Sequence, residues 1–225
     1  MSTRYDRTVS LIGEDNIKRL SRSTVAVVGL GGVGGAAVEI LARSGIGKLI
    51  LIDGDEFDVT NLNRQVLCTE RDIGRSKAVV AGERIKSVCG EISVECVSEF
   101  VTERNVDALI GNDISYCIDA IDDVRGKVAL ITACKRKNIP VVSAMGAGNR
   151  LDCAFAVCDI YKTSCDPFAR IMRRELKAAG VDALDTVCAQ TPPLKKAQTP
   201  ASVAAPPVVM GAMLANHAIS RLIEL

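Results

Sequence analysis

The sequence has no excess of charge of either sign, and it lacks any apolar run long enough to cross a membrane. Lys and Arg number 28 against 27 Asp and Glu, which excludes the global basic field of a general polyanion binder. Any contact with nucleic acid must therefore come from a local patch. The first residues contain no apolar segment of the signal-peptide kind, so we expect a cytoplasmic protein with no membrane contact.

The cysteines lack the spacing that zinc sites and disulfide frameworks use. Nine cysteines are scattered along the chain, and no two of them form a Cys-x-x-Cys pair. Cys153, Cys158 and Cys165 cluster in one region, but the only histidine, His217, lies in the apolar C-terminal stretch. We therefore expect no structural zinc, and we expect reduced thiols that are mostly buried as small apolar side chains.

The sequence does contain a β-turn-α-β pattern between Thr24 and Asp53. Four apolar residues lead into the run Gly-Leu-Gly-Gly-Val-Gly34, a helical pattern follows, and a second apolar run ends at Asp53. Glycines in such a turn let backbone amides approach a phosphate, and a carboxylate about twenty positions later binds a ribose hydroxyl. The pattern predicts a nucleotide site. The alternative is an ordinary turn with a solvated Asp53.

Strand and helix patterns alternate over the first 145 residues, which predicts a Rossmann-like α/β fold with a doubly wound, mostly parallel sheet. We expect an antiparallel extension after about residue 150, formed by 151–160. Asp166 and Pro167 predict a helix start, because aspartate caps helices and proline suits their first position. The apolar face of that helix is expected to hold Phe168, Ile171, Met172, Leu176 and Ala179. The other expected helices are 11–20, 76–88, 105–110, 124–137 and 208–225, the other expected strands are 91–97, 115–118 and 139–143, and 191–207 is expected to be an exposed loop.

A polar loop with Asn61, Asn63, Arg64 and Gln65 follows the second strand, and Lys77 falls in the first turn of the next helix. A cation there opposes the helix dipole, so Lys77 suits an anion-binding role. A nicotinamide dehydrogenase gives little reason to gather these groups, whereas a triphosphate needs fixed cations around it. The loop therefore favours ATP.

Carboxylates follow the strand at 115–118. Mg²⁺ takes one or two carboxylates together with phosphate oxygens, so we expect Asp122 in the site as a metal ligand. A role for Asp119 stays open at this point. The alternative is that Asp119, Asp122 and Asp123 cap the following helix.

In their order, these motifs resemble the adenylating domain of the ubiquitin-activating enzyme superfamily, which includes thiamine- and molybdopterin-pathway adenylyltransferases. The resemblance covers Arg4 to about Gly148. It rests on Gly-Leu-Gly-Gly-Val-Gly34, Asp53-x-Asp55, Thr-Asn61-x-Asn63-Arg64-Gln65, Gly74-x-x-Lys77 and Ile-Asp119-x-x-Asp122. It implies that a carboxylate attacks the α-phosphate of ATP, which releases pyrophosphate and leaves an acyl-adenylate.

The resemblance also implies residue roles. Asp53 would bind the ribose, Asn61, Arg64 and Lys77 the phosphates, and Asp122 Mg²⁺ or the transition-state phosphate. Arg7 resembles the family arginine that reaches the partner's ATP across a homodimer. The implied catalytic residues are Arg7, Arg64, Lys77 and Asp122, and the implied cofactor-binding residues are Gly29, Gly31, Gly32, Gly34, Asp53, Asp55, Asn61 and Gln65.

The second half resembles the tRNA threonylcarbamoyladenosine dehydratases, in Ala144-Met-Gly146-Ala-Gly148 and Asp166-Pro-Phe-Ala-Arg170-x-x-x-Arg174-x-Leu176. These enzymes activate the carboxylate of the modified base with ATP, and the carbamoyl nitrogen of the base then closes a hydantoin. The resemblance implies one adenylating domain over 1–225, with a core of 22–148 and a C-terminal extension and substrate loop of 149–225. A monovalent cation near Gly146–Gly148 stays open.

If the substrate is a tRNA, basic residues of the second half would contact its phosphates. The alternative is that these residues only form a solvated helix face. These cations are Arg170, Arg173, Arg174, Lys177, Lys195 and Lys196. The segment 186–192, which we interpret as a loop, lacks the Ser-x-Glu-x-Pro expected of the family. Its Cys188 is either a nucleophile or a buried thiol.

Three other functions stay open. One is an adenylyltransferase for a sulfur-carrier or ubiquitin-like protein, with sulfur-transfer partner proteins, although the two Cys-x-x-Cys pairs usual in sulfur-carrier enzymes are absent. A second is a non-catalytic subunit of a heterodimer, against which the intact set of Arg64, Lys77 and Asp122 argues. The third is a nicotinamide dehydrogenase.

Overall fold

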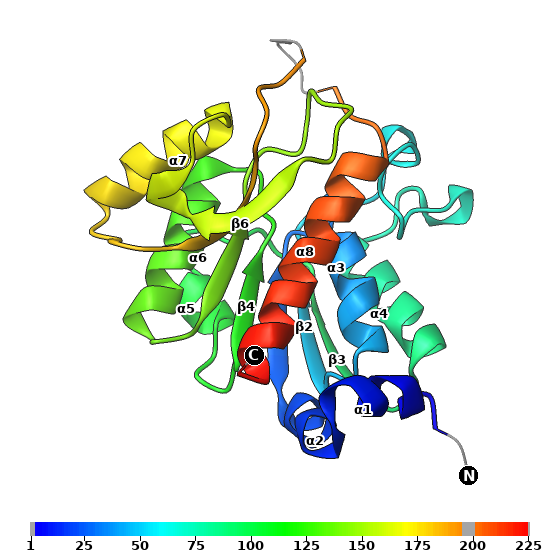
Figure 1. Ribbon diagram of the computed structural model, residues 1–225. Helices are drawn as coiled ribbons and strands as arrows, with labels where there is room; N and C mark the ends of the chain where they lie inside the picture. The colour runs from blue at the N-terminus through cyan, green and yellow to red at the C-terminus, as the bar shows by residue number, and fades with distance from the viewer. Residues whose placement is uncertain (1–2, 195–200, 225) are drawn as a thin grey trace.

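Seven strands form one twisted sheet in the order β3-β2-β1-β4-β5-β7-β6 (Figure 1). The computed structural model describes residues 3–194 and 201–224. Neighbouring strands are parallel except for β6 and β7, which are antiparallel. This confirms the doubly wound, mostly parallel sheet with an antiparallel extension after residue 150. The strands are β1 (Thr24–Val28), β2 (Lys48–Ile52), β3 (Ser93–Val97), β4 (Tyr116–Asp119), β5 (Val141–Ala144), β6 (Phe155–Asp159) and β7 (Asp185–Ala189).

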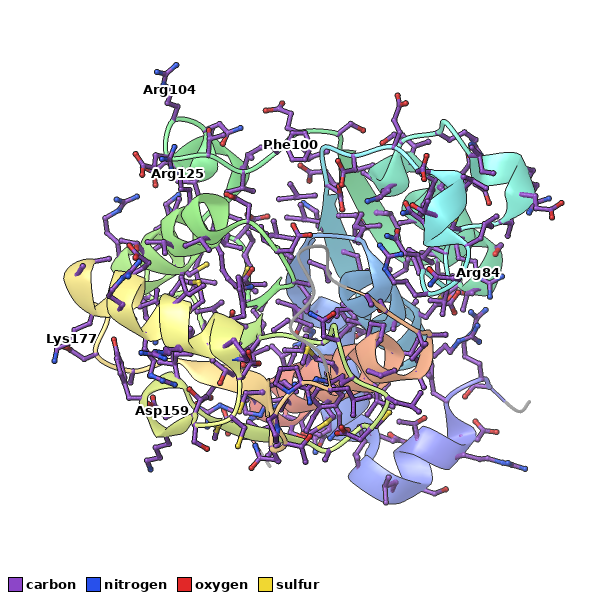
Figure 2. All side chains as sticks on the ribbon, turned by 90° about the horizontal axis from the view of Figure 1, so that it is seen from above. Arg84, Phe100, Arg104, Arg125, Asp159 and Lys177 are labelled. Atoms are coloured by element: carbon purple, nitrogen blue, oxygen red, sulfur yellow. The ribbon has the colours of Figure 1, made fainter. Side chains whose placement is uncertain are left out.

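Helices cover both faces of the sheet because alternate strand residues point to opposite sides. Val25 and Val27 of β1 belong to the apolar core under α3, α4 and α8, whereas Ala26 and Val28 belong to the core under α5, α6 and α7. Seen from above, α6 and α7 lie on one side of the strands and α3 lies on the other (Figure 2). The helices are α1 (Asp6–Ile12), α2 (Glu14–Arg22), α3 (Gly32–Arg43), α4 (Lys77–Val88), α5 (Val106–Leu109), α6 (Val124–Arg136), α7 (Pro167–Ala178) and α8 (Ala205–Leu222), with 3-10 turns η1 (Val59–Asn61), η2 (Glu70–Asp72) and η3 (Ile160–Lys162).

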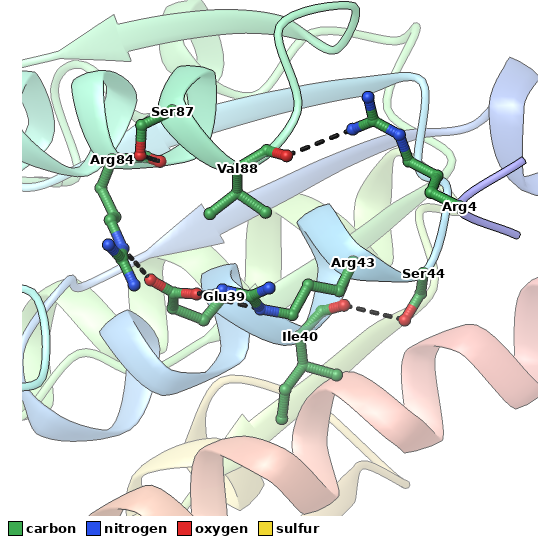
Figure 3. Close-up of polar contacts among 8 residues, drawn as sticks. All are labelled: Arg4, Glu39, Ile40, Arg43, Ser44, Arg84, Ser87 and Val88. Carbon is green, nitrogen blue, oxygen red and sulfur yellow. Dashed lines mark hydrogen bonds and ion pairs between the residues drawn. The ribbon is translucent and has the colours of Figure 1, made fainter.

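Helix α4 is joined by polar contacts both to α3, which starts at the glycine turn, and to the N-terminal segment (Figure 3). Glu39 of α3 accepts hydrogen bonds from Arg43, at 2.8 Å, and from Arg84 of α4. Burial raises the pKa of Glu39, but the hydrogen bonds from the two guanidinium groups outweigh it and lower the pKa overall. Arg4 donates to the carbonyl oxygen of Val88 at 3.2 Å and so fastens the N-terminal segment to the end of α4.

Helix α8 packs directly on the first turn of α3. A side chain at Gly211 would overlap the carbonyl oxygen of Val33, so the close approach of the two helices requires glycine. The expected helix 208–225 begins earlier than predicted, at Ala205. Pro206 and Pro207, which we expected in an exposed loop, are buried in the first turn of α8, where the missing proline N–H groups cost no helical hydrogen bond.

Several other expectations need correction. The predicted helix 11–20 is two helices, because the chain breaks at Gly13, whose φ is +83°. The predicted loop at 186–192 begins within strand β7, which pairs with β5 and β6 and is buried there. On α7 the buried residues are Ala169, Met172 and Leu176, whereas Ile171 and Ala179 of the predicted apolar face are exposed. The predicted extension 151–160 is shorter, because β6 begins only at Phe155, where its pairing with β7 starts.

No helix in the described parts of the chain is both long enough and apolar enough to span a membrane.

Candidate functional site

The register of the sheet brings the predicted site residues to one edge. Val28 at the end of β1 lies between Ile52 of β2 and Asp119 of β4. The glycine turn, the loop after β2 and the loop after β4 therefore leave the sheet side by side. The strand order reverses between β1 and β4, and ligands of open α/β sheets bind in the crevice at that point.

The glycine turn needs two of its glycines to close, while a third leaves space. Gly29 has a φ of +88°, and a side chain on it would come within 2.5 Å of the carbonyl oxygen of Ala120. A side chain on Gly34 would overlap the carbonyl oxygen of Gly29. At Gly31 the nearest atom to an added Cβ is Gln65 Nε2, at 3.8 Å. Gly31 therefore leaves room for a ligand beside the N-terminus of α3, whose first N–H groups lack helical partners.

Asp53 joins the glycine turn to the loop after β2. Its Oδ2 accepts the N–H of Leu30 at 2.5 Å, and its Oδ1 accepts the N–H of Asp55 at 2.8 Å. Burial raises the pKa of Asp53, and these two hydrogen bonds offset part of the rise. A carboxylate has about four acceptor positions, so the remaining ones are available to a ribose hydroxyl. Sequence reasoning missed the part of Asp53 in holding the turn.

Lys77 is a buried cation next to an exposed carboxylate. Its side chain is 8% exposed, and its Nζ lies 2.9 Å from Oδ2 of Asp55. The backbone N–H of Lys77 also donates to the carbonyl oxygen of Asp55, at 3.0 Å. An ammonium group has three donors, so Lys77 can bind an anion while Asp55 holds it in place.

The predicted polar loop is ordered and partly buried. Asn61 is 8% exposed, and its Oδ1 accepts the N–H of Asp58 at 3.2 Å, which leaves Nδ2 of Asn61 as a donor. Arg64 donates to the carbonyl oxygen of Thr60 at 2.9 Å and to Asn63 Oδ1 at 3.0 Å. These contacts fix the Arg64 guanidinium with donors to spare, because arginine has five.

Gln65 carries an unpaired polar atom beside the turn. The residue is 6% exposed, and its Oε1 is buried with no hydrogen-bond partner among the described residues. A buried acceptor without a partner costs free energy, and only a ligand group that donates a hydrogen bond would relieve that cost. The Nε2 donor of the same amide is the Gln65 atom nearest to Gly31.

The three carboxylates at the end of β4 and in the loop after it have different surroundings. Asp119 is fully buried, lies 2.8 Å from Lys127 Nζ and accepts Ser143 Oγ at 2.6 Å, so it is paired inside the protein and out of reach of a ligand. Asp123 caps α6 by accepting the N–H of Gly126 at 2.7 Å. Asp122 is exposed and forms no ion pair with the described residues. The capping interpretation is therefore right for Asp123, and Asp122 is the carboxylate that can meet a ligand.

The described residues bring together no group of three or more His, Cys, Asp or Glu side chains that could hold a metal ion. A Mg²⁺ ion bound through nucleotide phosphates needs no such group, because one carboxylate can complete its shell with phosphate oxygens and water. The exposed carboxylate of Asp122 fits that donor set.

Phe100 lies beside the loop after β2, a position that sequence reasoning missed. The side chain is 61% exposed, and its Cδ2 would lie 2.6 Å from a Cβ on Gly54. The ring therefore packs directly on the backbone between Asp53 and Asp55, and Figure 2 shows it at the end of the sheet where the loops gather. The available signal was a lone aromatic residue in a polar stretch after a strand, in a chain with four Phe.

Arg7 does not join the other predicted residues. It is exposed on α1, before the amino end of β1, whereas the glycine turn follows the carboxyl end of β1. Figure 1 shows α1 at the lower end of the sheet, near the start of the strands. Arg7 therefore cannot reach the nucleotide site of its own chain.

Cys188 lies in the core of β7. It is 1% exposed, and its sulfur is 3.2 Å from that of Cys158. Burial raises the pKa of the Cys188 thiol to about 12, so the thiol is neutral. This favours the buried thiol over the nucleophile.

The basic residues of α7 are not equivalent. Arg173 donates to the carbonyl oxygen of Thr163 at 2.7 Å, so it stabilises the turn before α7. Arg170 and Lys177 are exposed, and Figure 2 shows Lys177 projecting on the same side of the molecule as Arg104 and Arg125. The predicted contacts Lys195 and Lys196 lie outside the described residues.

A family model described as the ThiF family matches residues 5–225. The tRNA threonylcarbamoyladenosine dehydratase of Bacillus subtilis is 37% identical over 182 residues, which cover 80% of this chain and 72% of that protein. The Escherichia coli enzyme of the same name is 44% identical over 176 residues, 78% of this chain and 66% of that protein. The crystal structure of the E. coli tRNA N6-threonylcarbamoyladenosine dehydratase in complex with ATP has a TM-score of 0.92 and 36% identity, and the match covers 98% of this chain and 94% of that chain. The structural similarity thus includes β6, β7, α7 and α8.

Gly31→Ala and Gly34→Ala are expected to have different effects. Gly34→Ala should unfold the turn or lower the melting temperature strongly, because the new side chain overlaps Gly29. Gly31→Ala should melt near the wild-type temperature but bind ATP at least tenfold more weakly, since its Cβ fills the approach to the amides. Thermal unfolding and calorimetric titration with ATP measure the two effects. Wild-type ATP affinity in Gly31→Ala would contradict the placement of the phosphates.

Proposed function

The chain belongs to the ThiF family, and we propose that it uses ATP to adenylate the carboxylate of threonylcarbamoyladenosine in tRNA and then closes the base to its hydantoin form. The observation that carries this proposal is the match over nearly the whole fold to a dehydratase solved with ATP. In this chain, the glycine turn and the loop after β4 leave the sheet at the carboxyl ends of β1 and β4. Arg64 lies in the segment that follows β2, together with Lys77 at the start of α4, and Asp122 lies in the loop after β4. Residues 1–225 would act as one adenylating domain with its core at 22–148, in the cytoplasm.

The nucleotide would lie across the crevice between β1 and β4. The amides at Gly31 and Gly32 would face the phosphates, Asp53 would accept the ribose hydroxyls, and the ring of Phe100 would stack on the adenine. The donors around the triphosphate would come from Asn61, Arg64, Gln65 and Lys77. The open space at Gly31, where the nearest side-chain atom is the donor Nε2 of Gln65, supports this placement.

The reaction needs positioning and charge neutralisation more than covalent help from the protein. A carboxylate oxygen of the base attacks the α-phosphorus, the bond from that phosphorus to the oxygen bridging the α- and β-phosphates breaks, and pyrophosphate leaves with that oxygen. The carbamoyl nitrogen of the same base then attacks the acyl carbon, loses its proton and displaces AMP. Arg64 and Lys77 would neutralise the charge that builds on the phosphates. The ring closure is intramolecular, so the neutral, buried Cys188 has no part in it.

Asp122 would hold a Mg²⁺ ion, which when bound supplies positive charge to the phosphates. A monovalent cation near Gly146–Gly148 would meet a carboxylate that is already engaged. There the Asp166 carboxylate already accepts the N–H of Gly146 at 2.8 Å and caps α7.

The partners we propose are tRNA and a second copy of the chain. Exposed cations on α7, among them Arg170 and Lys177, would contact tRNA phosphates. In a homodimer, Arg7 would reach the ATP of the other subunit, which accounts for its distance from its own site. Sulfur-transfer proteins would be further partners, although nothing in the geometry of the site requires them.

Incubation of the protein with ATP, Mg²⁺ and tRNA that carries threonylcarbamoyladenosine tests the function. Mass spectrometry of the nucleosides should show a loss of one water from the modified base, with AMP and pyrophosphate formed in equal amounts. Arg64→Ala and Asp122→Ala should lower the rate by roughly a hundredfold or more, because each removes a charge at the phosphates. Arg22→Ala, an exposed arginine at the end of α2, is the matched control and should keep the wild-type rate. Pyrophosphate exchange driven by a carrier protein with a Gly-Gly tail, and not by tRNA, would show that the dehydratase assignment is wrong.

Phe100→Ala should raise the KM for ATP roughly tenfold, because stacking on a base contributes about 1–3 kcal/mol. Phe100→Tyr keeps the ring and should keep the KM, and neither change should lower the melting temperature appreciably, since the side chain is exposed. Steady-state kinetics with varied ATP measures both variants. If Phe100→Ala leaves the KM for ATP unchanged, the adenine lies elsewhere.

Arg7→Ala and Arg64→Ala should complement each other if Arg7 acts across a homodimer. Each variant alone should be inactive. A mixture in equal amounts, unfolded and refolded together, should recover about a quarter of the wild-type activity, because half of the dimers are mixed and each of these has one complete site. No recovery, in a mixture shown by mass spectrometry to contain mixed dimers, would exclude the action of Arg7 in the partner's site.

A further inference from the structure

The ion pair between Asp119 and Lys127 is buried between β4 and α6. Both side chains are 0% exposed, and the Lys127 Nζ is 2.8 Å from Oδ2 of Asp119. Desolvation of two charges offsets most of their attraction, so apolar residues in place of such a pair are often neutral or stabilising. Stability alone therefore does not explain why these two charges are buried here.

The two members of the pair hold both backbone groups of the same residue. Asp119 Oδ1 accepts the N–H of Ile121 at 3.1 Å, and Lys127 Nζ donates to the carbonyl oxygen of Ile121 at 2.8 Å. That carbonyl belongs to the peptide unit that joins Ile121 to Asp122. The ion pair thus sets the orientation of the peptide plane from which the next residue starts.

Asp122 lies between two fixed points. Ile121 is held on one side, and on the other side Asp123 caps α6 through the N–H of Gly126. The Asp122 side chain itself is exposed and unpaired among the described residues. Its backbone is therefore determined by its neighbours, while its carboxylate stays free for a ligand.

The same pair is held from two further elements. Ser143 of β5 donates to Asp119 at 2.6 Å, and the ring centroid of Phe168 in α7 lies 5.8 Å from the Lys127 Nζ. Asp119 thus contacts the strand next to its own, and Lys127 contacts the helix that we propose for tRNA binding. These contacts leave the ion pair little freedom to shift.

We propose that Asp119 and Lys127 are positioning residues for the adenylation step, and that their ion pair aims Asp122 at the phosphates of ATP by holding Ile121 from both sides. The inference rests on the proposed function, in which Asp122 acts at those phosphates. Neither Asp119 nor Lys127 touches the substrate.

The test separates positioning from stability with two double variants. The apolar double variant, Asp119→Leu with Lys127→Met, removes both charges and both hydrogen bonds to Ile121. Its melting temperature should fall by only a few degrees, because removal of the two charges is roughly neutral whereas Ser143 and Ile121 lose hydrogen-bond partners. Measured well below that temperature, kcat should fall roughly tenfold to a hundredfold with little change in the KM for ATP. The amide double variant, Asp119→Asn with Lys127→Gln, removes the charges but keeps an acceptor and a donor, and it should recover part of kcat. If both double variants keep the wild-type kcat, the pair is structural only.

Adding Asp122→Ala to each protein shows whether the pair acts through Asp122. Asp122→Ala should cost at least tenfold less in the apolar double variant than in the wild type, because Asp122 is already misplaced there. Equal losses in both backgrounds would overturn the inference. If Asp122→Ala leaves the kcat of the wild type unchanged, the proposed function itself fails. That result differs from a large loss of kcat that is equal in both backgrounds, which would overturn only the inference about the ion pair. If the apolar double variant does not fold, the amide double variant takes its place, and there the cost of Asp122→Ala should shrink by the same factor by which the amide changes lower kcat.

Discussion

Gly34 lies so close to the carbonyl oxygen of Gly29 that no side chain fits between the end of β1 and the first turn of α3. This close approach starts α3 directly at the sheet edge, and it directs the first amides of the helix toward the crevice between β1 and β4. Two other contacts depend on it. Asp53 accepts the N–H of Leu30 from within the turn, and α8 packs through Gly211 on Val33 in the first turn of α3. The nucleotide site and the packing of the last helix thus share one backbone constraint.

Around the turn, the charged residues are fixed before any ligand binds. Lys77 is held by Asp55, Arg64 by Thr60 and Asn63, and the backbone before Asp122 by the Asp119–Lys127 pair. Fixed charges need little reorganisation when charge develops on a phosphate, which is the advantage of a preorganised site. The contacts also extend toward the second half of the chain, because Asn63 Nδ2 donates to the carbonyl oxygen of Ser202 at 3.0 Å. The side chain that orients Arg64 is therefore in direct contact with the segment that leads into α8.

The parts of the fold that depend on local pattern could be predicted from the sequence. The glycine turn, the Asp166 cap and the alternation of strands and helices all follow from residues near one another in the chain. The parts that depend on contacts between residues far apart in the chain could not be predicted. Strand β7 has a short segment of Thr, Val and Cys that becomes a strand only because β5 and β6 pair with it on both sides. The same division holds for the site. Arg64, Lys77 and Asp122 stand in a recognisable motif, whereas Phe100 matters only because its ring packs on Gly54, and Lys127 only because it meets Asp119.

In the proposed reaction a substrate carboxylate attacks the α-phosphate of ATP, and the fate of the carboxylate oxygens reports directly on that attack. The tRNA base would be labelled with ¹⁸O in its carboxylate, and the products of one turnover would be analysed by mass spectrometry. One ¹⁸O atom is expected in AMP and none in pyrophosphate, because the acyl-adenylate breaks between the acyl carbon and the oxygen that bridges it to phosphorus. Label in inorganic phosphate, with ADP as the nucleotide product, would contradict adenylation and point to attack on the γ-phosphate.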